Sequence, residues 1–204
     1  MLMKQNKAVY FAAIFLIAAL FLGCFRFYVF NQGFYKKEFS KLEVYKDVAD
    51  ADRLSQRVID YFQGGAQLEE FNEREQNHME DVKSIIDSLI GLFYVSLIFL
   101  FGSLFLISRK DIKGLLLTSG ITGILMFFAI LLLSLNFGVF FDSFHRLFFE
   151  AGTWYFYNDD LIINLFPPEF FFDAFFSIIR MFFAASLILV GTGLFLPKNR
   201  MVNL

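Results

Sequence analysis

Residues 88–108 read SLIGLFYVSLIFLFGSLFLIS, a stretch without a single charge, and it decides the fold. A run of about 18 or more apolar residues with few charges is long enough to cross the hydrocarbon core of a bilayer as a helix. Residues 8–25 and 114–141 are also uncharged, and residues 174–197 contain one charge, Arg180. The sequence therefore predicts an all-α membrane protein with a bundle of four transmembrane helices.

The composition agrees with a membrane protein and excludes several other classes. Apolar residues make up 57% of the chain and charged residues 19%, whereas soluble domains are about 45–50% apolar and about 25% charged. A net charge of −2 gives no support to nucleic-acid binding, which requires a basic face. One Cys and two His exclude a disulfide framework and a Cys-rich zinc module.

The charges of the connections predict the orientation of the spans. Lys4, Lys7, the loop Arg109–Lys113 and the C-terminal Lys198 and Arg200 would share one side, with seven basic residues and one acidic residue. The other side would hold thirteen acidic and eight basic residues in 31–87, and six acidic and one basic in 142–173. Because cytoplasmic loops are rich in Lys and Arg, we expect both termini in the cytoplasm. We expect a single integral membrane domain over residues 1–204, with spans at approximately 8–30, 88–108, 114–135 and 174–197 and outward segments 31–87 and 136–173.

The N-terminal span has features of a lipoprotein signal peptide, because Lys4 and Lys7 precede an apolar stretch that ends in Leu22-Gly23-Cys24. Phe21 fits such a cleavage site poorly, and the apolar run continues beyond Cys24. We therefore expect a retained span in which Cys24 is a buried apolar side chain.

The outward segments are expected to form an extracytoplasmic cap. A helix is predicted over about Asp52–Phe62, and short strands are an option, for example at Lys41–Tyr45. Aromatic residues of the kind found where a bilayer meets water follow in the second segment: Trp154, Tyr155 and Tyr157. We expect Trp154 and Tyr155 to contact substrate or the membrane interface.

Both histidines fall on helix faces just outside the membrane. A helical repeat continues into the second span and consists of Phe71, Glu75, His78, Val82, Ile85 and Leu89. The other histidine, His145, shares a face with Phe141, Phe148 and Phe149. Asp81 follows His78 by three residues, and Asp142 precedes His145 by three. The two histidines are thus predicted to lie at the same depth on neighbouring helices.

A buried histidine beside a carboxylate is suited to proton transfer near neutral pH. We predict that His78 and His145 are catalytic, with support from Asp142, Asp81 and Glu75. One alternative is a metal-assisted hydrolase, with zinc between these histidines and carboxylates, but no HExxH spacing favours it and we expect neither metal nor cofactor. Another alternative is a non-catalytic membrane protein that binds an extracytoplasmic partner.

Two arginines near the outer ends of spans are further candidates. Arg26 lies in the first span and Arg180 in the fourth. Placing a charged side chain within a membrane span costs free energy, so each such residue is a candidate for a functional role. We expect Arg26 or Arg180 to support the site by stabilising an oxyanion. For Arg26 an equally good alternative is that its side chain extends to the interface between membrane and water.

Two groups of residues carry a family resemblance that extends over essentially the whole chain. The first comprises Phe71, Arg74, Glu75, His78, Met79, Asp81, Val82 and Lys83. The second comprises Phe141, Asp142, Phe144, His145, Phe149, Trp154, Asp160, Ile162, Phe166 and Pro167. Together they resemble the signatures of the bacterial lipoprotein intramolecular transacylases. The chain departs from the expected pattern at Pro167-Pro168-Glu169, where a single Pro is expected before the acidic residue.

The resemblance implies a specific reaction. Such enzymes take a lipoprotein whose N-terminal Cys carries a diacylglyceryl thioether and move the sn-2 acyl chain to the α-amine of the same Cys, which leaves a lyso-form lipoprotein. It also implies a bacterial cell membrane, a site facing the outer leaflet, and a diacylated lipoprotein and membrane lipid as partners. Neither nucleic acid nor a protein partner is implied.

Overall fold

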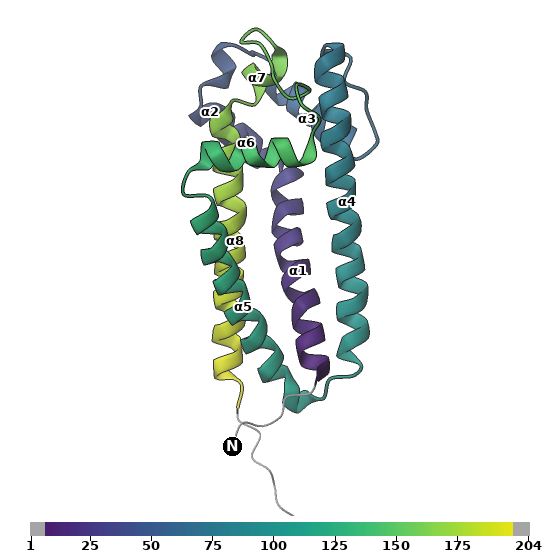
Figure 1. Ribbon diagram of the computed structural model, residues 1–204, viewed down its shortest axis with the longest axis vertical. Coiled ribbons are helices and arrows are strands. Elements are labelled where there is room, and N and C mark those ends of the chain that lie inside the picture. The colour runs from purple at the N-terminus through teal and green to yellow at the C-terminus, as the bar shows by residue number, and fades with distance from the viewer. Residues whose placement is uncertain (1–6, 198–204) are drawn as a thin grey trace, which may run out of the picture. The chain divides into compact units, whose positions relative to one another are not determined.

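The computed structural model of the protein describes residues 7–197, and over this range the chain is helical, without a strand. Four helices are long and apolar enough to cross a membrane (Figure 1): α1 (Lys7–Val29), α4 (Glu73–Leu104), α5 (Ile112–Leu133) and α8 (Pro168–Phe195). The predicted all-α membrane fold with four spanning helices is confirmed. Lys4, Lys198 and Arg200, which contribute to the predicted orientation, lie outside the described residues.

The shorter helices belong to the two segments that the sequence predicts to face outward, 31–87 and 136–173. The first contains α2 (Gln32–Lys41), the 3₁₀ helix η1 (Val44–Lys46) and α3 (Ala51–Phe62), and the second contains α6 (Phe137–Phe148) and α7 (Leu161–Leu165). A further 3₁₀ turn, η2 (Arg109–Asp111), precedes α5. Helix α3 matches the prediction for Asp52–Phe62, but Lys41–Tyr45 forms no strand. In that stretch Glu43 has a left-handed φ of 58°, which interrupts any extended conformation.

The described chain divides into two compact units. The membrane unit comprises residues 7–24, 91–132 and 179–197, and the cap unit comprises residues 25–90 and 133–178. Each unit has its own packing. The long helices α1, α4 and α8 contribute to both, because a single helix continues from one range into the next.

Small residues let α5 and α8 pack closely in the membrane unit. A Cβ added to Gly120 would lie 2.6 Å from Val190 Cγ2 and 2.8 Å from the carbonyl oxygen of Ser186. A Cβ on Gly193 would lie 2.9 Å from the side chain of Leu117. Glycines at such contacts bring helix backbones together where lipid gives no hydrophobic drive for association. Gly120 and Gly193 therefore serve the packing of the bundle.

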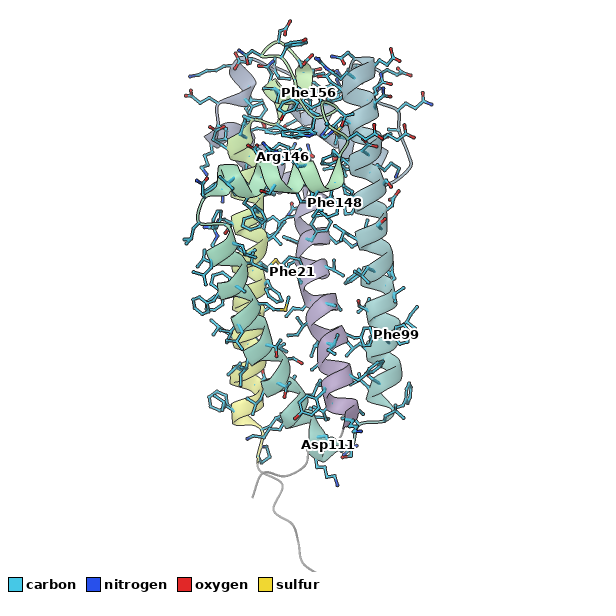
Figure 2. The ribbon with its side chains drawn as sticks, in the orientation of Figure 1. Phe21, Phe99, Asp111, Arg146, Phe148 and Phe156 are labelled. Atoms are coloured by element: carbon cyan, nitrogen blue, oxygen red, sulfur yellow. The ribbon has the colours of Figure 1, made fainter. Side chains whose placement is uncertain are left out.

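Aromatic pairs fill other contacts of the membrane unit. Phe99 of α4 stacks on Phe15 of α1 at 4.9 Å between ring centroids, and Phe21 of α1 meets Phe182 of α8 edge to face at 5.3 Å (Figure 2). Cys24, also on α1, is buried as expected. The abundant Phe residues thus pack between spanning helices as well as in the cap unit.

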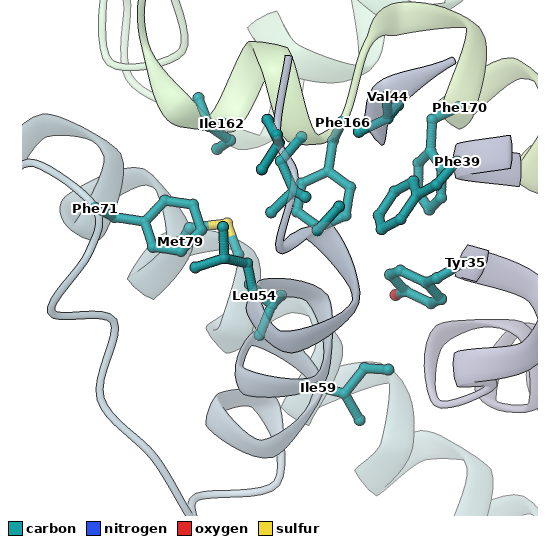
Figure 3. Packing of buried hydrophobic residues seen from close by; sticks show 14 of the residues in the cluster. Tyr35, Phe39, Val44, Leu54, Ile59, Phe71, Met79, Ile162, Phe166 and Phe170 are labelled. Atoms are coloured by element: carbon teal, nitrogen blue, oxygen red, sulfur yellow. The ribbon is translucent and has the colours of Figure 1, made fainter. Parts of the chain in front are cut away.

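The cap unit has a core that joins the two outward segments (Figure 3). Phe39 of α2 is fully buried, and its ring lies 6.0 Å from that of Phe166 and 5.9 Å from that of Phe170. The same cluster includes Leu54 and Ile59 of α3, Met79 of α4 and Ile162 of α7. The second outward segment is therefore held against α2, α3 and α4, and this contact positions the site.

Candidate active site

Helix α4 begins with a capping box that also anchors α7. Asn72 Oδ1 accepts a hydrogen bond from the backbone N–H of Glu75 at 3.0 Å, and Glu75 Oε2 accepts one from the backbone N–H of Asn72 at 2.7 Å. Glu75 Oε1 accepts a third bond, at 2.7 Å, from the backbone N–H of Ile162 in the first turn of α7. The carboxylate, only 1% exposed, therefore fixes the starts of two helices relative to each other.

His78 lies about one turn further along α4, before the apolar run that starts at Ser88. Its side chain is 6% exposed and packs against Phe149 and Phe156, with ring centroids 4.8 and 5.3 Å away. Its Nδ1 is buried without a hydrogen-bond partner in the described part of the chain. Burial, together with the nearby His145, lowers the pKa of His78 to about 4, so the ring is neutral at pH 7.

His145 lies on α6, an amphipathic helix of the cap unit. Asn136 caps this helix by accepting a hydrogen bond from the backbone N–H of Val139. The apolar side chains of Val139, Leu147 and Phe148 are exposed, whereas His145 is 9% exposed and turned into the unit. In Figure 2 the labels Arg146 and Phe148 mark α6, and the label Phe156 marks the loop that follows this helix.

The protonation of His145 follows from its hydrogen bond. Its Nδ1 lies 2.8 Å from the carbonyl oxygen of Phe141. Because a carbonyl only accepts, Nδ1 carries the proton in the neutral ring, and Nε2 has the free lone pair. Burial lowers the pKa of His145, while the bond to Phe141 and the charge of Asp142 act in the opposite direction. The ring is therefore a neutral base at pH 7.

The two histidines meet within an aromatic enclosure. Their ring centroids are 6.2 Å apart, at an interplanar angle of 16°. Phe149 contacts both rings, and Trp154 lies 4.8 Å from the His145 ring and stacks on Tyr155 at 4.1 Å. The structure thus brings together the two histidines and Trp154, although His78 and Trp154 are 76 residues apart in sequence.

A polar cluster holds the loop that carries Trp154 and Phe156. Asp160 is buried and accepts hydrogen bonds from the Arg74 guanidinium, from Asn72 Nδ2 at 3.0 Å and from the backbone N–H of Tyr157 at 2.6 Å. The guanidinium also lies over the Tyr157 ring, 4.5 Å from its centroid. Residue spacing alone did not predict this role for Arg74 or Asp160. The Asn72-x-x-Glu75 spacing was a detectable sign of a helix start.

Five further residues were predicted to support the site: Asp81, Asp142, Glu75, Arg26 and Arg180. Asp81 and Asp142 are exposed, and neither has a hydrogen bond to a histidine within residues 7–197. Glu75 bonds to backbone N–H groups instead, and Arg26 is exposed beside the Phe30 ring. Arg180 is an exposed residue of α8 in the membrane unit. Among the described residues, no group of three or more His, Cys, Asp or Glu is placed to hold a metal ion.

The fold and the site define a multi-pass membrane protein with two buried histidines in its cap. The family of the lipoprotein intramolecular transacylase Lit matches residues 10–171, and the chain belongs to this family of acyltransferases. The family expected from the residue signatures is thereby confirmed.

Solved structures of the Bacillus cereus lipoprotein intramolecular transacylase Lit share the fold. One superposes with a TM-score of 0.81 at 22% identity, covering 91% of this chain and 92% of the other. A variant with one histidine replaced by alanine has a TM-score of 0.79 at 22% identity, covering 93% and 91%. An uncharacterized protein of Aquifex aeolicus (strain VF5) is 30% identical over 125 residues, 61% of this chain. The chain spans 56% of the length of that relative.

Proposed function

We propose that the protein is a lipoprotein intramolecular transacylase that moves the sn-2 acyl chain of a diacylglyceryl-modified N-terminal Cys to the α-amine of the same Cys. The observation that carries this proposal is the pair of buried, neutral imidazoles in a chain of this family. The substrate supplies both the amine nucleophile and the ester. The enzyme therefore needs to bring them together and to move one proton, which two histidines suffice to do.

His145 acts as the general base in this scheme. Its Nε2 lone pair takes a proton from the amine as the amine nitrogen attacks the ester carbonyl carbon. The Phe141 carbonyl, 2.8 Å from Nδ1, keeps the ring in the tautomer that exposes Nε2. The same bond stabilises the imidazolium that forms, so a backbone group performs the orienting role expected of Asp142.

His78 serves the departing glyceryl oxygen. Because its pKa is lowered to about 4, it is a neutral imidazole at pH 7 with one N–H to donate. As the amide bond forms and the ester C–O bond breaks, the His145 imidazolium returns the proton it took from the amine to the glyceryl oxygen, while the His78 N–H stabilises the charge that develops on that oxygen. The enzyme ends in the protonation state in which it began, and the products are an amide and a free hydroxyl on one molecule.

We place the reaction at the outer leaflet of a bacterial cell membrane, with both termini in the cytoplasm. Support comes from the basic loop Arg109–Lys113 at one end of the spans and the acidic segments 31–87 and 142–173 at the other. The partners are the diacylated lipoprotein and membrane lipid.

The test is tandem mass spectrometry of the N-terminal lipopeptide after a diacylated lipoprotein is incubated with purified protein. Intact mass is uninformative, because the acyl chain moves within one molecule. Fragments that carry the acyl chain on the amine with the wild type, but not with His145→Asn, support the proposal. Unchanged fragments from a folded wild-type sample refute it and favour the partner-binding alternative. Loss of transfer on chelation alone would favour the metal alternative.

A further inference from the structure

Trp154 is the only tryptophan of the chain, and its indole N–H has an unusual environment. Nε1 is buried and has no hydrogen-bond partner among residues 7–197. The indole nitrogen is a donor only, and a buried indole N–H generally has an acceptor. A donor held in this state points to an acceptor on a ligand.

The indole is fixed beside the proposed base. Its ring centroid lies 4.8 Å from that of His145 and 4.1 Å from that of Tyr155. The loop that carries it is anchored by Asp160, which binds Arg74 and the backbone N–H of Tyr157. Because Nε1 belongs to the ring that contacts His145, an acceptor bound there lies next to the imidazole. The donor is thus in place before any reaction starts, as electrostatic catalysis requires.

We propose that the Trp154 indole N–H is a catalytic donor that binds the carbonyl oxygen of the migrating acyl group. This inference rests on the proposed function. When the amine nitrogen bonds to the carbonyl carbon, the carbonyl electron pair moves to oxygen and forms an oxyanion, which the indole N–H stabilises. When the pair returns, the C–O bond to glycerol breaks and the glyceryl oxygen receives the proton.

A neutral donor suits this site better than a cation. A positive charge beside His145 would lower the pKa of the imidazole further and weaken it as a base. The guanidinium of Arg74 is already engaged with Asp160, and Arg26 is exposed beside Phe30. The indole N–H donates at every working pH without a change of charge.

The first test is Trp154→Phe, which keeps a large apolar ring and removes the N–H. We expect kcat to fall about 100-fold, the typical effect of removing one oxyanion donor, with little change in KM and an unchanged pH profile. Tyr94→Phe, at an exposed aromatic residue of the apolar part of α4, is the matched control and should keep wild-type activity. Wild-type kcat in Trp154→Phe would overturn the inference while leaving the proposed function intact. A wild type that transfers no acyl chain would refute the proposed function itself.

The second test needs no variant, because a single tryptophan gives an unambiguous spectrum. The probe is a diacylglyceryl lipopeptide whose amine is acetylated, so that no transfer takes place. Its partner probe has an sn-2 ether in place of the ester and therefore no carbonyl oxygen there. We expect the hydrogen-bond-sensitive indole band in the ultraviolet resonance Raman spectrum to shift with the ester and not with the ether. Equal spectra with both probes would contradict the assignment, whatever Trp154→Phe does to folding.

Discussion

The rings of His78 and His145 lie nearly parallel, 16° apart in orientation and 6.2 Å between centroids, although they come from different helices. At this separation the charge of one imidazolium disfavours a second, and the presence of His145 lowers the pKa of His78. The pair therefore accepts at most one proton beyond the two that its neutral rings carry under working conditions. That is the number of protons an intramolecular acyl transfer from oxygen to nitrogen has to move.

His145→Asn distinguishes the roles of the two ring nitrogens of the proposed base. The amide N–H of Asn offers a donor for the Phe141 carbonyl, but the side chain has no basic nitrogen in place of Nε2. We expect kcat to fall by about 10²- to 10⁴-fold, the usual contribution of general acid–base catalysis, with little loss of stability. Timed tandem mass spectrometry of the acyl position measures the rate. Turnover near the wild-type value in a folded sample would exclude His145 as the base.

The lowered pKa of His78 predicts a loss of stability in acid. The unfolded chain binds a proton near the ordinary pKa of 6.5, whereas the folded chain binds it only near pH 4. The free energy of unfolding should therefore fall as the pH drops through this window, by about 3 kcal/mol from this group. Thermal unfolding in detergent at pH 7.5 and 4.5 measures the change. His78→Gln should lose less stability than the wild type between these two values, and an equal loss would argue against a buried neutral His78.

Glu75→Gln should destabilise the cap unit. The carboxylate accepts from the backbone N–H groups of Asn72 and Ile162, both at 2.7 Å, and an amide would face one of them with its own NH₂. A buried donor left without an acceptor costs about 1–3 kcal/mol. Glu73→Gln, at an exposed position two residues earlier, is the control. Hydrogen exchange at the Ile162 amide should accelerate in Glu75→Gln only. Unchanged protection there would show that Glu75 does not anchor α7.

Gly120→Ala should weaken the contact between α5 and α8. The added Cβ would meet backbone atoms of Ser186 and Val190, each at 2.8 Å, and these cannot move without separating the helices. We expect a destabilisation of about 1–3 kcal/mol, as for overpacking in a core. Gly102→Ala adds the same methyl group where nothing lies within 4 Å and should be neutral or slightly stabilising. Thermal unfolding of both variants tests this difference, and equal midpoints would contradict it.

The parts of the structure that follow a repeat were predictable from sequence. The uncharged runs indicated the spanning helices, and the 3.6-residue repeat of Phe71, Glu75 and His78 indicated a helix with a buried face. Helix α3, whose residues Leu54, Val58 and Ile59 are buried, was found in the same way. The resemblance supplied the family, which residue patterns alone do not define.

The parts that depend on tertiary contacts were not predictable. Spacing placed Asp142 three residues before His145 and so favoured it as the partner of the imidazole, but the carbonyl oxygen of Phe141 takes that place. Every residue has a backbone carbonyl, so the residue types do not indicate which carbonyl accepts the bond. The hydrogen bonds that Asp160 accepts from Asn72 and Arg74 join positions more than eighty residues apart. A local periodicity cannot predict contacts between such distant positions.

Helix α6 has a consequence for the kinetics. It exposes Val139, Leu147 and Phe148 and carries His145 on its buried side, a pattern typical of helices that lie in the membrane interface. Substrate then arrives by lateral diffusion in two dimensions, and the concentration that matters is the mole fraction of lipoprotein in the bilayer. Adding inert phospholipid at constant amounts of enzyme and lipoprotein dilutes the substrate in this sense. Turnover should slow accordingly, although the bulk molarity of every reactant stays the same.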